Sequence, residues 1–114
     1  MQIIDKVSIS ELKELSRKMM DDIVKANIDV KEKIVIIDAE FHADMETYLL
    51  ENGSNNEDIW GINLHPYKYG TDEFIEFDSM INLKPRYGNH SRYIEDEDIR
   101  KKIIKIVNDV VVDA

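Results

Sequence analysis

Residues 34–44 read IVIIDAEFHAD, an aliphatic run followed by polar side chains at every second position. In an extended chain, alternate side chains lie on the same face of a sheet. Glu40, His42 and Asp44 would then project together, and the small or apolar residues between them would point the other way. The stretch therefore predicts a strand over residues 34–41 that carries a polar site at its end.

The composition limits the kind of protein this can be. The chain has 114 residues, 43% of them hydrophobic, which suits one domain over residues 1–114 with a single core. It has no cysteine, so disulfides, thiolate nucleophiles and cysteine-bound metals are excluded within this sequence. A metal ion would have to be bound by His, Asp, Glu or amide oxygens.

The charge balance disfavours nucleic acids and membranes as partners. Acidic residues number 24 against 15 basic ones, a formal net charge of -9, which repels polyanions. No apolar run approaches the roughly 20 residues needed to cross a bilayer, and no secretion signal begins the sequence. We therefore expect a cytoplasmic protein that binds neither nucleic acid nor membrane.

The first half of the chain predicts two helices and three strands. A short strand is expected over residues 2–5, and Ser8 and Glu11 form a capping box that starts a helix reaching to about residue 21. Strands over residues 23–30 and 34–41 flank a short polar break and are expected to form a hairpin. Asp44 is a suitable N-cap for a short helix over residues 45–51.

In the second half of the chain, apolar and polar residues alternate more clearly. Residues 59–66 predict a strand with Trp60, Ile62 and Leu64 on one face and Asn63 on the other. Residues 73–83 predict a further strand. Its core-facing residues would be Ile75, Phe77, Ile81 and Leu83, and those facing away would be Phe74, Glu76, Asp78, Met80 and Asn82.

The carboxy-terminal helix has the strongest pattern. Acidic residues 95–98 favour the start of a helix, and an apolar stripe follows at Ile99, Ile103, Ile106, Val107 and Val110. The last valines either fray or extend as a strand. These elements give an α+β fold of order β-α-β-β-(α)-β-β-α. We expect a mainly antiparallel sheet of four to five strands with two longer helices on one face.

Several short motifs occur in order along the chain. They are E-x-H-A-D from Glu40, W-G-x-N from Trp60, E-F-D-S-M-I-N-x-x-P from Glu76 and G-N-x-S-R from Gly88. This pattern, which spans nearly the whole chain, resembles a small prokaryotic family of unknown function. The resemblance implies a compact prokaryotic cytoplasmic domain and no particular reaction.

The polar face of the predicted sheet is the candidate site. His42, Glu40 and Asp78 are the expected catalytic residues and the expected ligands of a divalent metal such as zinc, manganese or magnesium. With arginines nearby, they predict a metal-assisted hydrolase of a small anionic substrate. The residues expected to contact the ligand are Asn63, Asn82, Asn89, Arg92 and Trp60, the last of which also fits the core.

Two non-enzymatic alternatives stay open. Alternating carboxylates are typical of any solvated antiparallel face, and no established catalytic motif is present in the sequence. A mixed apolar and polar face would suit an interaction module that forms a homodimer or binds a protein partner. Residues 84–92 contain three basic side chains and no acidic one, which suits a binder of an anionic metabolite, although a loop with surface ion pairs has the same composition.

Overall fold

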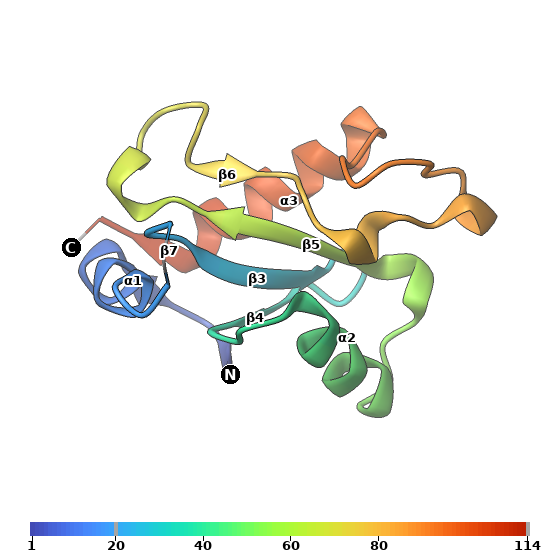
Figure 1. The fold of residues 1–114 in the computed structure, drawn as a ribbon, viewed down its shortest axis with the longest axis horizontal. Coiled ribbons are helices and arrows are strands. Elements are labelled where there is room, and N and C mark those ends of the chain that lie inside the picture. The colour runs from blue at the N-terminus through green and yellow to red at the C-terminus, as the bar shows by residue number, and fades with distance from the viewer. Residues whose placement is uncertain (20, 114) are drawn as a thin grey trace.

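The computed structural model describes residues 1–19 and 21–113 and shows the predicted α+β fold (Figure 1). Its sheet has five strands in the order β1-β4-β3-β5-β6, and each neighbouring pair is antiparallel. The strands are β1 (Gln2–Ile4), β3 (Val24–Asp29), β4 (Ile34–Ile37), β5 (Ile59–Leu64) and β6 (Ile75–Glu76). The predicted fold class, with a mainly antiparallel sheet, is confirmed.

The main core lies between this sheet and helix α3 (Glu97–Val110). Asp96 caps the helix by accepting a hydrogen bond of 2.8 Å from the Asp98 N–H. Because β3 and β5 pair with Ala26 opposite Ile62, the even-numbered side chains of both strands point to the same face. Those side chains are buried against α3 together with Ile103 and Val107, as the apolar stripe predicts.

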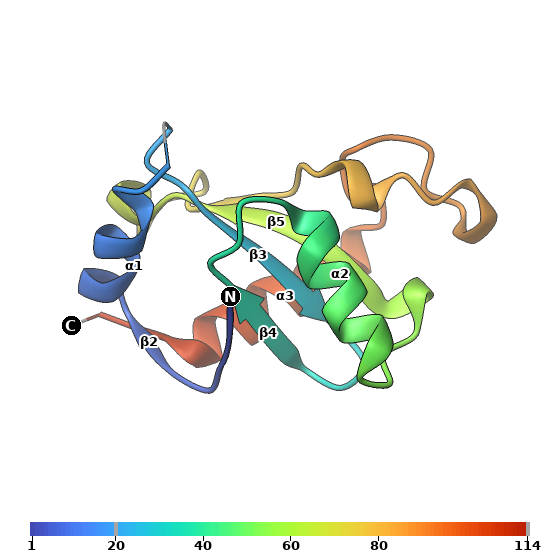
Figure 2. The ribbon, with the colours of Figure 1, turned by 60° about the horizontal axis from the view of Figure 1, so that its bottom comes forward.

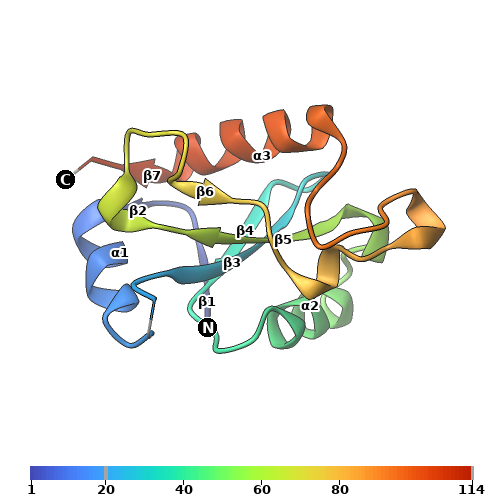
Figure 3. The same ribbon diagram turned by 45° about the horizontal axis from the view of Figure 1, so that its top comes forward.

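The opposite face of the sheet carries helix α2 (His42–Glu51), seen below the sheet in Figure 3 with α3 above it. Met45 and Leu49 pack there against Ile36 and Ile59 in a second, smaller core. The third helix, α1 (Ile9–Ser16), lies beside the end of the strands, where Leu12 joins the main core (Figure 2). The expected uncovered face is therefore partly covered, because α2 is a full helix that buries its own apolar residues.

A second, two-stranded sheet joins the beginning and the end of the described chain. Strand β2 (Val7–Ser8) pairs in parallel with strand β7 (Val111–Val112). The final valines thus extend as a strand. No helix in residues 1–19 and 21–113 is long and apolar enough to cross a membrane.

Two predicted elements end earlier than expected. The strand over residues 34–41 stops at Ile37, because Asp38 adopts a left-handed conformation with φ of 69° and turns the chain away from the sheet. The helix predicted to reach residue 21 ends at Ser16. His42 is consequently the first residue of α2 and does not lie on a strand, so the expected common face of Glu40, His42 and Asp44 is wrong.

The strand predicted over residues 73–83 is mostly irregular. Only Ile75–Glu76 pairs with β5, and the chain then forms a short 3-10 helix at Met80–Asn82. Phe74 is buried in the main core and Leu83 is exposed, opposite to their predicted sides. The alternating pattern failed here because side-chain amides, described below, take the place of a strand beside β5.

Candidate functional site: a pocket at the start of helix α2

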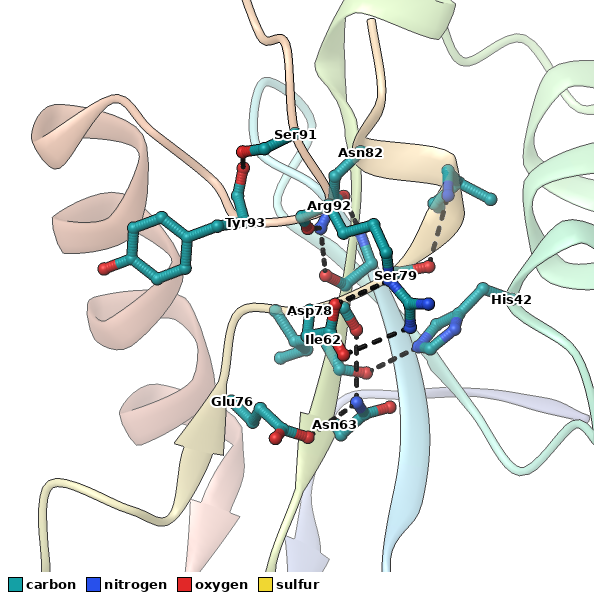
Figure 4. Close-up of polar contacts among 12 residues, drawn as sticks. His42, Ile62, Asn63, Glu76, Asp78, Ser79, Asn82, Ser91, Arg92 and Tyr93 are labelled. Atoms are coloured by element: carbon teal, nitrogen blue, oxygen red, sulfur yellow. Dashed lines mark hydrogen bonds and ion pairs between the residues drawn. The ribbon is translucent and has the colours of Figure 1, made fainter.

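A pocket of about 250 Å³ lies where the first turn of α2 meets β3, β5 and the loop of residues 77–93. Its position follows from the fold: α2 crosses the polar face of the sheet, and the loop closes over the outer edge of β5 (Figure 4). We call it the His42 pocket. It is lined by Lys25, Phe41, His42, Ala43, Asn63, Asp78, Ser79, Met80, Ile81 and Arg92.

His42 forms the inner wall of the pocket. Its Nε2 lies 2.8 Å from the carbonyl oxygen of Ile62. Because a carbonyl can only accept, Nε2 carries the hydrogen and donates it. Burial lowers the pKa of His42, and the positive charges of Lys25 and Arg92 lower it further, against the opposing effects of the Ile62 carbonyl and Asp78. The imidazole is thus neutral at pH 7, and Nδ1 keeps its lone pair.

Two cationic side chains reach the pocket from different elements. Lys25, on β3, donates from Nζ to the carbonyl of Glu40 at 2.8 Å, which leaves two of its three hydrogens free. Arg92 binds Asp78 through two hydrogen bonds, at 2.8 Å from Nε and 3.1 Å from Nη2. Nη1 of this guanidinium makes no such bond with residues 1–19 and 21–113 and is the donor available to a ligand.

The start of α2 adds backbone donors. Phe41 occupies the N-cap position and provides no side-chain hydrogen bond to the first turn. Asp44 lies inside that turn and is exposed, so the prediction that it caps the helix is wrong. The uncapped first amides carry the partial positive charge of the helix end, which favours an anion. The buried hydroxyl of Ser79 accepts from the N–H of Ile81 at 3.3 Å and keeps its own hydrogen to donate.

Asn63 lies at the floor of the pocket and is only 7% exposed. Its Nδ2 donates to Oε1 of Glu76 at 2.8 Å and to the carbonyl of Asp78 at 3.1 Å. Since both partners are acceptors, the orientation of the amide is fixed. Its Oδ1 is buried and accepts no hydrogen bond from the described residues. Figure 4 shows this oxygen on the side away from Glu76, toward His42.

Asn82 and Asn89, predicted to contact a ligand, instead hold the loop in place. Asn82 pairs with both backbone groups of Gly61 and also donates to the carbonyl of Arg92 at 3.0 Å. Asn89 donates to three carbonyls of the loop and accepts from the N–H of Glu95 at 2.9 Å. Both side-chain amides are buried, and in each one the nitrogen donates and the oxygen accepts a hydrogen bond. They hold the backbone around Arg92 in place, and its side chain lines the pocket.

The three predicted metal ligands are not arranged around a common point. The side chain of Glu40 is exposed, both oxygens of Asp78 bind Arg92, and Nε2 of His42 binds a carbonyl. Within the described part of the chain, no group of three or more His, Cys, Asp or Glu residues is arranged to hold a metal ion. The donor set therefore does not fit a metal ion in this arrangement.

Trp60 belongs to the main core and not to the pocket. It is buried, its Nε1 has no partner among the described residues, and the ammonium of Lys84 lies 5.7 Å from its ring centre. Sequence reasoning missed Lys25 and Ser79 as pocket residues. The signal for Lys25 was its alternation with the apolar residues of β3, which places it on the same face as Asn63, its partner in the register.

Comparison with known proteins identifies the family of this sequence but does not indicate an activity. Residues 1–110 match the model of one family, described as a protein of unknown function (DUF5674). No curated protein and no solved structure matches the chain. The resemblance to an uncharacterised family is thereby confirmed, whereas prokaryotic origin and cytoplasmic location stay predictions.

Proposed function

We propose, for this chain that belongs to the DUF5674 family of proteins of unknown function, that it binds a small organic anion in the His42 pocket. The proposal rests on one observation. Lys25 and Arg92 approach the same pocket from different elements, at a helix start whose first amides are uncapped. Both cations keep free N–H donors beyond the bonds they make within the protein.

The charges around the pocket support an anion. Arg92 neutralises Asp78, so Lys25 and the helix start contribute the remaining positive potential. This is a local exception in a chain whose formal net charge is -9, and long-range attraction contributes little. We therefore expect affinity to come from short hydrogen bonds to the anionic group and to be modest.

Metal-assisted hydrolysis of the anion stays a prediction with weaker support. It needs a third ligand beside His42 and Asp78, and Asp78 would have to release Arg92 to bind a metal ion. The neutral His42 with a free Nδ1 is suited to accept a proton, so the pocket contains one element of general base catalysis. We propose binding as the function and leave His42 as the residue that a reaction would use.

A second candidate is an interaction surface, because apolar side chains surround the pocket. Phe41 is 58% exposed and Met80 63% exposed, and Leu83 and Tyr87 continue the surface along the loop. A homodimer or a protein partner would cover these residues. Light scattering after size exclusion tests self-association: a monomer at high micromolar concentration contradicts the homodimer and leaves anion binding unaffected.

Anion binding is tested by titrating the ¹⁵N-labelled protein with inorganic phosphate and with acetate at low ionic strength. We expect saturable shifts of the Ala43 amide, which lies in the first turn of α2 at the pocket. Lys25→Gln and Arg92→Gln should each weaken binding about fivefold or more, the usual effect of losing a charge-assisted hydrogen bond. Lys101→Gln is the matched control, since Lys101 lies on α3 outside the pocket and pairs with Glu97.

Two results contradict the proposal. One is the absence of saturable shifts with either anion at millimolar concentration. The other is an equal loss of affinity in Lys25→Gln, Arg92→Gln and Lys101→Gln, which indicates nonspecific attraction to surface charge.

A further inference from the structure

The His42 pocket has acceptors as well as donors. Oδ1 of Asn63 is buried without a hydrogen-bond partner among the described residues, although the Nδ2 of the same amide has two. Turning the amide over would put Oδ1 against two other oxygens, so it cannot be satisfied in that way. Nδ1 of His42 is the second acceptor, because Nε2 carries the hydrogen.

An anion without a hydrogen-bond donor, such as acetate, fulfils only half of this arrangement. It would accept hydrogen bonds from Lys25, Arg92 and Ser79 but would offer nothing to Asn63. A buried acceptor that is left unpaired costs about 1–3 kcal/mol. A ligand with a hydrogen-bond donor beside its anionic group would remove this cost, and the pocket would select for it.

We infer that the ligand is a hydroxy acid, a small carboxylate with a hydroxyl on a neighbouring carbon, and that Asn63 is the residue that determines this specificity. The inference rests on the proposed function and names the chemical class of its ligand. The carboxylate binds Lys25, Arg92 and the first amides of α2. The hydroxyl donates to Oδ1 of Asn63.

A hydroxyl is favoured over an ammonium group as this donor. Lys25 and Arg92 are both close enough to His42 to oppose a positive charge on its ring. The pocket lining contains these two cations and a single carboxylate, Asp78, which is already paired with Arg92, so an ammonium group inside the lining would meet a net repulsion. A neutral donor avoids this repulsion. The pocket volume of about 250 Å³ accommodates a short acid of this kind.

The test compares three acids that differ in one group. Propionate, lactate and alanine share a three-carbon carboxylate and carry hydrogen, hydroxyl and ammonium on the neighbouring carbon. Each is titrated into the full-length labelled protein, and dissociation constants are taken from the Ala43 amide. We expect lactate to bind about tenfold more tightly than propionate, in line with the cost of a buried unpaired acceptor, and alanine to bind more weakly than lactate.

Asn63→Leu removes the acceptor with little change of size, together with the two hydrogen bonds that Nδ2 donates to Glu76 and to the carbonyl of Asp78. It should bring lactate to the affinity of propionate while propionate itself changes less than about twofold, a split that general damage to the pocket would not produce. Thermal unfolding and the amide spectrum confirm that the variant is folded. If it does not fold, the comparison of glycolate with acetate on the unaltered protein repeats the test of the hydroxyl.

The outcomes separate this inference from the function on which it rests. Equal, saturable binding of propionate and lactate that is lost in Arg92→Gln overturns the hydroxy acid and retains anion binding. Alanine binding as tightly as lactate overturns the choice of hydroxyl. The absence of saturable binding by all three acids and by phosphate overturns both proposals.

Discussion

Asn82 pairs with Gly61 as a neighbouring strand would. The N–H of Gly61 donates to Oδ1 of Asn82 at 2.8 Å, and Nδ2 of Asn82 donates to the carbonyl of Gly61 at 2.9 Å. Both partners are buried. One side chain thus completes the hydrogen bonding of β5 at a point where β6 has already ended.

Replacing Asn82 should destabilise the protein strongly. Asn82→Ala leaves the two backbone groups of Gly61 without partners, which we expect to lower the free energy of unfolding by about 3 kcal/mol. Urea denaturation measures the change. Asn108→Ala is the control, because Asn108 is exposed on α3 and its replacement should alter stability by less than about 0.5 kcal/mol. Similar losses in the two variants would show that Asn82 contributes no special pairing.

Gly61 is required by the close approach of the loop. A Cβ at this position would lie 2.7 Å from the Cβ of Ser79, and 3.0 Å from Cγ1 of Ile81. Gly61→Ala should therefore cost about 1–3 kcal/mol, as overpacking usually does. Adding Ser79→Gly removes the nearest atoms and should recover about 1 kcal/mol relative to the sum of the single variants. Strictly additive losses in this double-mutant cycle would contradict a direct clash.

The neutral state of His42 gives stability a defined dependence on pH. Its folded pKa is lowered from 6.5 by burial, so below 6.5 the unfolded chain takes up a proton that the folded protein resists. The contribution of His42 to the free energy of unfolding is thus largest above pH 6.5. It should fall as the pH drops from 6.5 toward the lowered pKa, by up to about 1.4 kcal/mol per pH unit.

His42→Gln should flatten this dependence below pH 6.5, because glutamine does not titrate. Its amide can still donate to the carbonyl of Ile62, so the fold is retained. His90→Gln is the control, since His90 is exposed on the loop, and it should keep the slope of the unaltered protein. An unchanged slope in His42→Gln would place the pH dependence elsewhere.

In the proposed function, the pairing of Asp78 with Arg92 limits anion binding. Asp78→Asn removes the carboxylate that occupies two donors of Arg92. We expect phosphate to bind about fivefold more tightly, corresponding to roughly 1 kcal/mol of relieved repulsion. Stability should change by less than about 1 kcal/mol, because both side chains are substantially exposed.

Glu14→Gln provides the comparison for Asp78→Asn. It removes the carboxylate that binds Arg17 at 2.9 Å, outside the His42 pocket. Phosphate affinity should therefore stay the same. A weaker binding of phosphate by Asp78→Asn would indicate that Asp78 holds Arg92 in the position that binding requires.

The regular parts of the fold follow from periodicity in the sequence. The stripe from Ile99 to Val110 predicted α3, and the alternation of Trp60, Ile62 and Leu64 predicted the buried face of β5. Both patterns report burial against a single neighbouring layer. They succeed because one layer covers the whole length of the element.

The irregular parts depend on contacts between distant residues. The pairing of Asn82 with Gly61 replaces a strand, and no local pattern distinguishes it from the alternation of an ordinary strand. Asp38 turns the chain with a left-handed conformation, and helix α2 then begins at His42. One pocket is lined by His42, Asn63, Asp78 and Arg92. They meet there because the chain turns at Asp38 and because side-chain amides hold the loop, and they do not share one face of the sheet.

The parallel pairing of Val7 with Val111 affects how the chain folds as it is synthesised. The ladder of β2 and β7 cannot form until the end of α3 has emerged from the ribosome, and α3 itself covers the main core. Until then, the apolar face of the nascent sheet is exposed to water and to other chains. This exposure favours aggregation and binding by chaperones. The protein therefore gains its stability in a late step, when α3 docks and the two distant strands meet.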